Sequence, residues 1–499
     1  MDPSRNDTPS PSLWETRHPF AARPPAPGGR ADAVVVGAGL TGLVTALLLA
    51  RAGKKVVVLE ARHVGALASG RNTGKLSLLQ GTRLSQLLSM HPAGVARAYV
   101  EANREGMDWL LRFCEDHGVA QHPRSAVTYA ATPAEVDRID AEHAAARSLG
   151  LPTLRQPTQD VPFPVHAAVV LEDQAQLDPQ ALLLALADQV EQHGGVIGEG
   201  QRVVDVSWGS RPTVRTEDGS TFATDDVVLA TGTPILDRGL YFAKLEARRS
   251  YLLTYTGAAV PGSMMISAGQ DARSLRDVPD GDQLLMVGGS GHRVGHGRAA
   301  LDHVEQLRAW VAEHYPGAVE THAWSAQDYA SHDGIPYVGK LPRGRGSVWL
   351  ASGYDKWGLS NAPGAALRIA AGILGGSMPW ARPLERRITR PRAAYQVLRR
   401  NLDVAATAVS RLAGAELSEV STSTPQRVGA VGRRGLDPRP VGVVSQGCAV
   451  RAVCTHLGGT LRWNDAERSW DCPLHGSRFA DDGTVLEGPA VRPLARVEE

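Results

Sequence analysis

Four residues near the C-terminal end of the sequence have the types and spacing of metal ligands. Cys454 and His456 form a C-x-H pair, and after fifteen intervening residues Cys472 and His475 form a C-x-x-H pair. In a chain with 4 cysteines among 499 residues, chance produces this spacing with a probability on the order of 10⁻⁵ to 10⁻⁴. Two thiolates and two imidazoles suit either a structural zinc ion or a two-iron cluster in which two histidines bind one iron. The sequence therefore predicts a metal centre here.

Three glycines near the N-terminal end predict a dinucleotide site. Gly37, Gly39 and Gly42 form a G-x-G-x-x-G that follows a β-branched run and precedes a helix-forming segment, and Glu60 ends a second apolar run 18 residues later. In such a βαβ unit the backbone approaches a pyrophosphate at the helix N-terminus, and the acid accepts a hydrogen bond from a ribose hydroxyl. An acid at this position disfavours NADP because of its 2′-phosphate. The pattern leaves NAD and FAD open.

A series of later segments resembles segments of the D-amino-acid oxidase-like family of FAD oxidoreductases, and they follow one another along this chain in the same order as in that family. The segments are residues 69–76, 177–180 (which opens a helix), 194–204, 227–232, 333–339 and 353–360. The resemblance covers residues 31 to about 376 and implies FAD as the cofactor. It also implies a set of FAD-contacting residues: Gly37, Gly39, Leu40, Thr41, Gly42, Glu60, Ala61, Arg62, Ser69, Asn72, Thr73, Gly74, Lys75, Leu76, Val203, Thr231, Gly232, Lys356, Trp357, Gly358, Leu359 and Ser360.

The same resemblance implies that the substrate is a small amine or amino acid, whose C–H bond delivers a hydride to the flavin. Four residues are candidates for the catalytic site. Arg249, or its neighbour Arg248, could hold a carboxylate through two hydrogen bonds, with Tyr251 close to it in the sequence. His292 ends an expected strand, and Lys356 lies in a segment that resembles a flavin-ring loop.

The segments around the four metal ligands resemble the two ligand loops of a Rieske domain. Residues 454–459 and 470–479 carry the resemblance, and residues 488–490 extend it. The resemblance implies a Rieske-type [2Fe–2S] cluster held by Cys454, His456, Cys472 and His475.

This segment departs from many Rieske proteins in one respect. Those proteins carry one more cysteine in each loop and join the two by a disulfide, whereas this sequence has Gly459 and Leu474 at these positions. The loops must therefore be held by packing and hydrogen bonds, which resembles the ferredoxin-like Rieske type. Of the two remaining cysteines, we expect Cys114 in the core of a helix and Cys448 in a buried strand.

Together these motifs predict an α/β fold with a split Rossmann-type FAD-binding domain, an inserted α+β substrate domain with an antiparallel sheet, and a small all-β Rieske domain at the C-terminus. The expected parts are an extended N-terminal arm (1–30), the FAD-dependent oxidoreductase (31–376), an Arg-rich linker with a bridging helix (377–426) and the Rieske domain (427–499). Within the oxidoreductase, residues 31–76, 166–239 and 326–376 are expected to bind FAD, and residues 77–165 and 240–325 to bind substrate.

Periodicity predicts several elements in the substrate-binding part. Helices are expected over residues 95–114 and 133–149, and strands over 251–255 and 284–287. Thr132 and Glu135 are expected to form a capping box at the start of the second helix. An amphipathic helix over 393–412, in an arginine-rich stretch, is expected to dock within the molecule rather than on a membrane surface.

Composition and charge exclude several classes of protein. The sequence has 53 lysines and arginines and 52 aspartates and glutamates, which give a net charge of +1. We therefore expect no nucleic-acid partner. Residues 33–50 carry no charge, but their glycines predict strand, turn and helix rather than a transmembrane segment. The absence of a signal-peptide pattern and the few cysteines indicate a cytoplasmic protein.

A flavin takes up two electrons as a hydride and an iron–sulfur cluster passes one at a time, so their combination predicts an oxidoreductase that feeds an external acceptor such as a quinone, a ferredoxin or an oxygenase. Two alternatives remain. The chain could be an electron-transfer component fed by an external reductant, or an oxygen-dependent oxidase with a structural or sensory cluster. A mononuclear-iron oxygenase is disfavoured because no His/His/carboxylate motif accompanies the Rieske segment.

Overall fold

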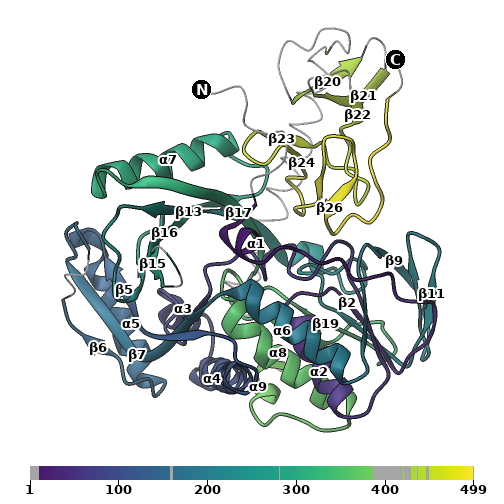
Figure 1. Ribbon diagram of the computed structural model, residues 1–499, viewed down its shortest axis with the longest axis horizontal. Coiled ribbons are helices and arrows are strands. Elements are labelled where there is room, and N and C mark those ends of the chain that lie inside the picture. Colours follow the sequence, from purple (N-terminus) through teal and green to yellow (C-terminus); the bar gives the residue numbers. More distant parts are fainter. Residues whose placement is uncertain are drawn as a thin grey trace.

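The computed structural model describes residues 11–157, 161–279, 281, 283–385, 420, 429–434, 437–444 and 449–497. The expected bridging helix at 393–412 and Cys448 lie outside the described residues. The described residues form a main body and a smaller C-terminal domain, which Figure 1 shows in yellow above the body.

A six-stranded, mostly parallel sheet forms one half of the main body, in the order β18-β19-β12-β2-β3-β8. Its strands are β2 (Ala33–Val36), β3 (Val56–Leu59), β8 (Val196–Gly198), β12 (Asp226–Leu229), β18 (Tyr337–Lys340) and β19 (Val348–Ser352). Only β18 runs antiparallel to its neighbour. β2 and β3 are buried at every residue, as expected for a parallel sheet that is covered on both faces.

Helices cover one face of this sheet and a small second sheet covers the other. The helices are α2 (Leu40–Arg51), α6 (Pro179–Gln192) and α8 (Gly358–Ile373), which lie side by side in Figure 1. The small sheet has the order β1-β11-β10-β9. Its strands are β1 (Gly29–Arg30), β9 (Val203–Val206), β10 (Thr213–Thr216) and β11 (Thr221–Ala223). The predicted strand, turn and helix at residues 33–50 are confirmed.

A nine-stranded, mostly antiparallel sheet forms the other half of the main body, in the order β17-β13-β16-β15-β14-β5-β7-β4, with β6 on β7. Its strands are β4 (Lys75–Leu76), β5 (Gln121–Ala130), β6 (Leu154–Arg155), β7 (Ala167–Leu177), β13 (Leu245–Thr256), β14 (Met264–Ser267), β15 (Ser274–Val278), β16 (Leu284–Arg293) and β17 (Val319–Ser331). The predicted strands at 251–255 and 284–287 lie within β13 and β16. β7 and β17 extend this sheet into segments that we expected to bind FAD.

Further helices of the main body are α3 (Arg83–Met90), α4 (Ala93–Asp116), α5 (Val136–Ser148), α7 (Ala300–His314) and α9 (Ala381–Glu385), with short 3₁₀ turns at Pro133–Glu135 and Tyr241–Ala243. α5 and α7 pack on the nine-stranded sheet, α3 packs on α5, and α4 packs on α8 and α9. Cys114 is fully buried in α4, as predicted. No helix in the described part of the chain is long and apolar enough to cross a membrane.

The predicted capping box at residue 132 is wrong. Thr132 makes no side-chain capping bond, because a 3₁₀ turn separates it from α5. Glu135 instead accepts a hydrogen bond from the backbone N–H of Ala131 at 2.8 Å. At α6, by contrast, Asp178 caps the helix by accepting from the N–H groups of Gln180 and Ala181. The segment 177–180 therefore opens a helix, as expected.

The N-terminal arm is less extended than expected. Residues Leu13–Arg17 form helix α1, which Ser12 and Glu15 close with a capping box. Leu13 and Trp14 are buried among residues of the nine-stranded sheet, and the Trp14 indole N–H donates to the carbonyl of Asn72 at 2.8 Å. Burial of one large aromatic side chain anchors the arm to the loop that precedes β4.

The C-terminal domain is built from two small antiparallel sheets, as expected. One contains β20 (Ala430–Arg434), β21 (Asp437–Val443) and β22 (Ala449–Arg451), and the other contains β23 (Arg462–Asn464), β24 (Ser469–Asp471), β25 (Arg478–Phe479) and β26 (Val485–Glu487). Its core gathers around Trp470 and Phe479, together with Cys454 and Cys472.

Candidate functional site

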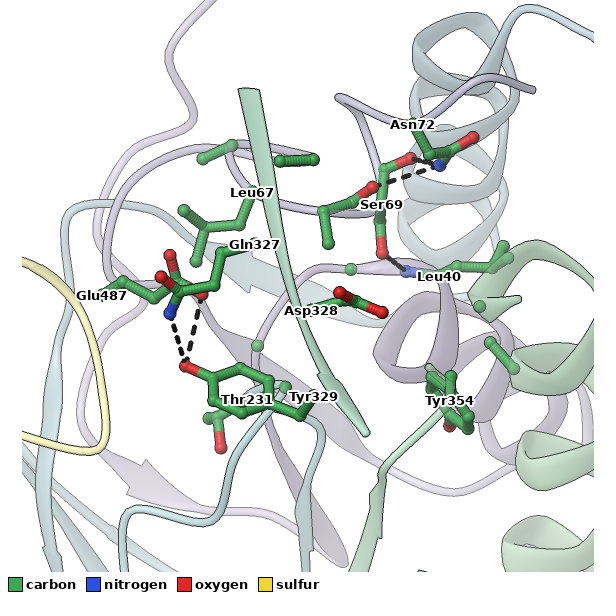
Figure 2. Close-up of a pocket in the computed structure, with 18 of the residues that line it drawn as sticks. Leu40, Leu67, Ser69, Asn72, Thr231, Gln327, Asp328, Tyr329, Tyr354 and Glu487 are labelled. Carbon is green, nitrogen blue, oxygen red and sulfur yellow. Dashed lines mark hydrogen bonds between the residues drawn. The ribbon is translucent and has the colours of Figure 1, made fainter. Parts of the chain in front are cut away.

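A cavity of about 330 Å³ lies between the six-stranded and the nine-stranded sheets, and Figure 2 shows part of its lining. Most of the predicted FAD-contacting residues line it: Gly37, Gly39, Leu40, Thr41, Glu60, Ala61, Arg62, Ser69, Asn72, Thr73, Lys75, Val203, Thr231, Gly232, Lys356, Trp357, Gly358 and Leu359. Gly42, Gly74, Leu76 and Ser360 lie outside the lining. The structure therefore brings together residues from six separate segments of the sequence.

The glycines after β2 shape one end of this cavity. Gly37 has a positive φ of 106°, and a Cβ there would lie 2.6 Å from the carbonyl oxygen of Ala230. A Cβ at Gly42 would lie 2.0 Å from the carbonyl oxygen of Gly37, so Gly42 allows α2 to pack on the turn rather than to contact a ligand. The N-terminus of α2 thus opens toward the cavity with a backbone cradle that suits a pyrophosphate.

Glu60 holds the turn as well as lining the cavity. Its carboxylate accepts hydrogen bonds from the N–H groups of Ala38 at 2.8 Å and Arg62 at 2.9 Å. Burial raises the pKa of Glu60, and the two backbone hydrogen bonds oppose that rise. The carboxylate lies at the end of β3, where a ribose hydroxyl of a dinucleotide is expected.

The loop before β4 is organised by its own side chains. Asn72 donates to the carbonyl oxygens of Ala68 and Ser69 and accepts from the N–H of Gly74. The Ser69 hydroxyl accepts from the N–H of Leu40 at 3.1 Å, as Figure 2 shows. These bonds fix the loop against the start of α2, so the two predicted cofactor segments form one surface.

Lys75 is buried at the same wall. Its ammonium donates to the carbonyl oxygen of Met265 and to the hydroxyl of Ser274, each at 2.7 Å. Burial holds the pKa of Lys75 well below its usual value, and the nearby Arg276 adds to the effect. Lys75 thereby links the cofactor loop to the nine-stranded sheet.

The loop before α8 closes another side of the cavity. Tyr354 shares a hydrogen bond of 2.8 Å with Thr41, and Lys356 has a positive φ of 72°. A Cβ at Gly291 would lie 2.5 Å from Nζ of Lys356 and 3.1 Å from Oγ of Ser250. The absence of a side chain at Gly291 therefore lets a cation and a hydroxyl meet at the cavity wall.

One hydroxyl group at this end of the cavity has no hydrogen-bond partner among the described residues. The side-chain oxygen of Ser250 is buried and lies beside Lys356 at the cavity wall. The Tyr251 hydroxyl is also buried without a partner among these residues, but its ring lies on the opposite face of β13, where it stacks on His292 and on His303 of α7. Buried polar groups are almost always satisfied in folded proteins. This end of the cavity is therefore built for a polar ligand.

His292 supports Tyr251 but does not line the cavity. Its ring stacks on Tyr251 with centroids 5.7 Å apart and on His303 with centroids 3.9 Å apart. Burial, followed by the proximity of His303, lowers the pKa of His292 to about 4. The structure thus places His292 behind a cavity residue, as a neutral packing partner.

Arg249 also lies outside the cavity. Its side chain is 1% exposed and pairs with Asp471 of the C-terminal domain at 3.1 Å. It also donates to Ser325 at 3.0 Å and to Gln327 at 2.9 Å. Because these groups engage both terminal nitrogens of the guanidinium, Arg249 does not face the cavity as a ligand for a substrate carboxylate. Arg248 is engaged by Glu246 and Asp355.

Asp328 is a cavity residue that the sequence did not single out, and it interacts with Asp355, which lies outside the lining. Asp328 lines the cavity, and burial, followed by repulsion from Asp355, raises its pKa to about 6. Burial opposes ionisation of Asp355 as well, but Arg83 and Arg248 hold its pKa at about 2. These residues come from distant segments, so no local pattern could have connected them.

The four predicted metal ligands meet at one end of the C-terminal domain. The thiols of Cys454 and Cys472 are buried and hydrogen bonded to each other. The rings of His456 and His475 pack edge to face with centroids 5.2 Å apart. The donors thus form a sulfur pair and a nitrogen pair, which fits two irons better than four donors on one zinc ion.

One nitrogen of this set is positioned for a metal. Nδ1 of His456 is buried without a hydrogen-bond partner among the described residues, while Nε2 contacts Asp237 of the main body at 2.8 Å. An orphaned ring nitrogen beside a second histidine suits iron ligation, with the other nitrogen oriented by a carboxylate. The residues therefore fit a Rieske cluster.

The two ligand loops pack together without a disulfide. A Cβ at Gly459 would lie 2.6 Å from Leu474 and 3.2 Å from Sγ of Cys472. The Leu474 side chain therefore fills the space next to Gly459. These are the two positions at which many Rieske proteins carry the cysteines of a disulfide.

The C-terminal domain forms part of the cavity wall. Leu486, Glu487, Gly488, Ala490 and Val491 line the cavity together with residues of the main body.

Two residues of β17 connect this wall to the ligand loop. Gln327 lines the cavity and donates to the carbonyl oxygen of Gly476, the residue after His475, at 2.8 Å. Tyr329 also lines the cavity, and its hydroxyl donates to the carbonyl oxygen of Gly488 at 3.2 Å. One layer of side chains therefore separates the cavity from a cluster-ligand loop.

Comparison with known proteins agrees with this division of the chain. Residues 32–371 match the family model described as FAD dependent oxidoreductase, and residues 415–498 match the Rieske [2Fe-2S] domain. The Bacillus subtilis protein YhfW, whose name describes a Rieske 2Fe-2S iron-sulfur protein, is 31% identical over 485 residues, which cover 94% of this chain and 93% of that protein.

Two glycine oxidases resemble the main body alone. The glycine oxidase of Pseudomonas putida is 27% identical over 374 residues, which cover 69% of this chain and 95% of that protein. The crystal structure of glycine oxidase from Geobacillus kaustophilus aligns with a TM-score of 0.60 and 20% identity, over 70% of this chain and 96% of that chain. The structural match supports the fold of the main body.

Proposed function

Because the chain belongs to the FAD-dependent oxidoreductase family and carries a Rieske [2Fe-2S] domain, we propose that it oxidises a small amine or amino acid and passes the electrons to an external acceptor through the Rieske cluster. FAD supplies hydride acceptance, and the cluster supplies single-electron transfer. Amino compounds are favoured as substrates because glycine oxidases are among the relatives of the main body.

The contact between Gln327 and Gly476 is the observation that carries this proposal. Gln327 faces the cavity and its amide holds the loop that contains the ligands Cys472 and His475. A carrier domain that served an unrelated task would not need its ligand loop at the cavity wall. The short separation favours direct transfer of electrons within one chain.

The polar end of the cavity is where we place the substrate. Lys356 provides a cation, and the hydroxyl of Ser250 beside it is available to donate or accept a hydrogen bond. An amino acid presents a carboxylate that fits a cation with an adjacent hydroxyl. His292, held neutral by burial, stacks on Tyr251 on the opposite face of β13 and does not line the cavity.

An anaerobic titration tests the proposal. The purified protein is mixed with a panel of α-amino acids and of primary and secondary amines, and absorbance is followed at flavin and cluster wavelengths. We expect at least one compound to bleach the flavin first and the cluster afterwards. Bleaching by NADH alone would contradict the proposal and favour an electron-transfer component fed by an external reductant.

A Cys472→Ser variant distinguishes the proposal from an oxidase. The substitution removes one cluster ligand, so we expect substrate to reduce the flavin normally while turnover with an artificial acceptor of single electrons is lost. Hydrogen peroxide formed by the parent and the variant at the same rate would favour an oxygen-dependent oxidase with a structural cluster.

A further inference from the structure

Glu487 is a buried carboxyl that the Rieske domain places in the cavity of another domain. It ends β26, is 5% exposed and lines the cavity between the two sheets. Tyr329 of the main body approaches one carboxyl oxygen at 3.4 Å, and Arg478 approaches the other at 3.7 Å. Figure 2 shows Glu487 beside Gln327 and Tyr329 at one wall of the cavity.

The arginines around Glu487 are already paired with other carboxylates. Arg249 of β13 and Arg478 of β25 face Asp471 of β24 and Glu467 of the preceding turn.

Arg62, on the loop after β3, also faces Glu487, and it faces Glu60. Arg202, which donates to the carbonyl oxygen of Val485, lies 4.0 Å from Glu217, and Arg71, which faces Glu467, pairs with Glu15 at 3.1 Å. Each of these arginines thus meets another acid, and an ionised Glu487 would add one more negative charge in a buried place. Burial raises the pKa of Glu487 to about 7, although Arg478 and Arg249 oppose the rise. An anionic ligand in the same cavity would disfavour the ionised form further.

We propose that Glu487 is part of the FAD site, contributed by the Rieske domain, and that it is protonated while FAD is bound. The diphosphate of FAD brings negative charge into the cavity, so the Glu487 carboxylate takes up one proton from solvent as the cofactor binds. The acid then donates a hydrogen bond inside the cavity. FAD binding and docking of the Rieske domain are thereby coupled, because one residue serves both.

The proposal does not depend on the substrate, so its failure and the failure of the proposed function are separable. The first test compares infrared spectra of the FAD-loaded parent and a Glu487→Gln variant at pH 7.5. We expect the C=O stretch of one protonated carboxyl in the parent and its loss in the variant. Identical carboxyl bands in the two proteins would overturn the proposal. The visible absorbance of the cluster reports that the Rieske domain of the variant is folded.

The second test measures FAD binding to the apoprotein between pH 6 and pH 9. Binding should be constant below about pH 7 in the parent and should weaken by up to about tenfold per pH unit above it, because the free site then has to gain a proton. Glu487→Gln keeps the shape without the charge, so its affinity should match the parent at pH 6 and stay flat over this range. A variant that keeps the pH dependence of the parent, or that loses FAD at pH 6, refutes the proposal.

A control variant sharpens this test. Glu142→Gln is the matched control, since Glu142 is fully buried with a pKa raised by burial but accepts hydrogen bonds from Leu84 and Ser85 away from the cavity. Its FAD-binding profile should follow the parent.

Discussion

At the scale of single residues, the nucleotide end of the cavity depends on the absence of side chains. A Cβ at Gly42 would lie 2.0 Å from the carbonyl oxygen of Gly37, a separation that real Cβ atoms do not reach. Because α2 is packed on β2 through this contact, the helix would have to move away from the cofactor turn. Gly42 is therefore a packing residue of the site rather than a ligand-contacting residue.

We expect Gly42→Ala to lower both stability and FAD content. Overpacking of this kind typically costs about 1–3 kcal/mol, and the displaced helix N-terminus would no longer face the pyrophosphate. The measurements are the melting temperature and the flavin absorbance per protein.

Gly94 provides the matched control. It lies in the first turn of α4, and a Cβ there would have nothing within 4 Å. Gly94→Ala should be stabilising by roughly 1 kcal/mol, because alanine is the better helix former. Equal FAD content in the two variants would show that the Gly42 contact is not critical.

Other residues of the site could not be predicted from the sequence. The spacing of Cys454, His456, Cys472 and His475 predicts a metal centre because all four lie on two neighbouring loops. Glu487, Gln327 and Tyr329 carry no comparable signal. Their positions at the cavity depend on how two domains dock, and neither their type nor their spacing reveals that contact.

At the scale of elements, the local pattern predicts the βαβ unit well. β2, α2 and β3 follow from a β-branched run, glycines at fixed offsets and a second apolar run, all within 30 residues. Helix α1 was not predicted, because five residues form a helix here only when Trp14 is buried against the nine-stranded sheet. The extension of β7 and β17 beyond the expected segments likewise results from pairing between distant strands.

The packing of α7 on β16 affects how the stability of the protein changes at acidic pH. α7 brings His303 onto His292, whose pKa burial lowers to about 4 in the folded chain. The unfolded chain binds a proton at this position near pH 6.5. Between these two values the unfolded state holds more protons, so stability falls as the pH decreases from about 6.5 toward 4.

We therefore expect His292→Gln to reduce the acid sensitivity of the protein. Protonation at this one position should cost the parent about 2 kcal/mol of unfolding free energy at pH 5 relative to pH 7.5, and the variant should lack this part. Melting temperatures at the two pH values provide the measurement. The same substitution at the exposed His193 is the control and should follow the parent. If His292→Gln also follows the parent, the stacked pair does not determine the acid response.

At the scale of the whole molecule, two domains share one buried ionic network. Arg249 of the main body is 1% exposed and pairs with Asp471 at 3.1 Å and with Glu467 at 3.9 Å, both in the Rieske domain. Further contacts surround this network: Arg202 donates to the carbonyl oxygen of Val485, and His296 contacts the carbonyl oxygen of Pro473. The docked arrangement places the ligand loop of the cluster at the wall of the flavin cavity.

We expect Arg249→Met, measured with FAD in excess so that the flavin site stays filled, to slow electron transfer from flavin to cluster. Removal of one partner from a buried ion pair costs about 3–5 kcal/mol, because Asp471 and Glu467 would remain buried with Arg478 alone. A penalty of this size on the docked state reduces its population by about 100-fold or more, so the cluster should follow the flavin only after a delay.

Flash photoreduction of the flavin, with the cluster absorbance recorded afterwards, measures this step without a substrate. Arg308→Met is the matched control, because Arg308 pairs with Glu320 at 2.7 Å within the main body and contacts no residue of the Rieske domain in the described ion pairs. The control should transfer electrons at the rate of the parent. An Arg249→Met variant that retains both cofactors and the parental rate would show that the buried network does not hold the domains in their electron-transfer arrangement.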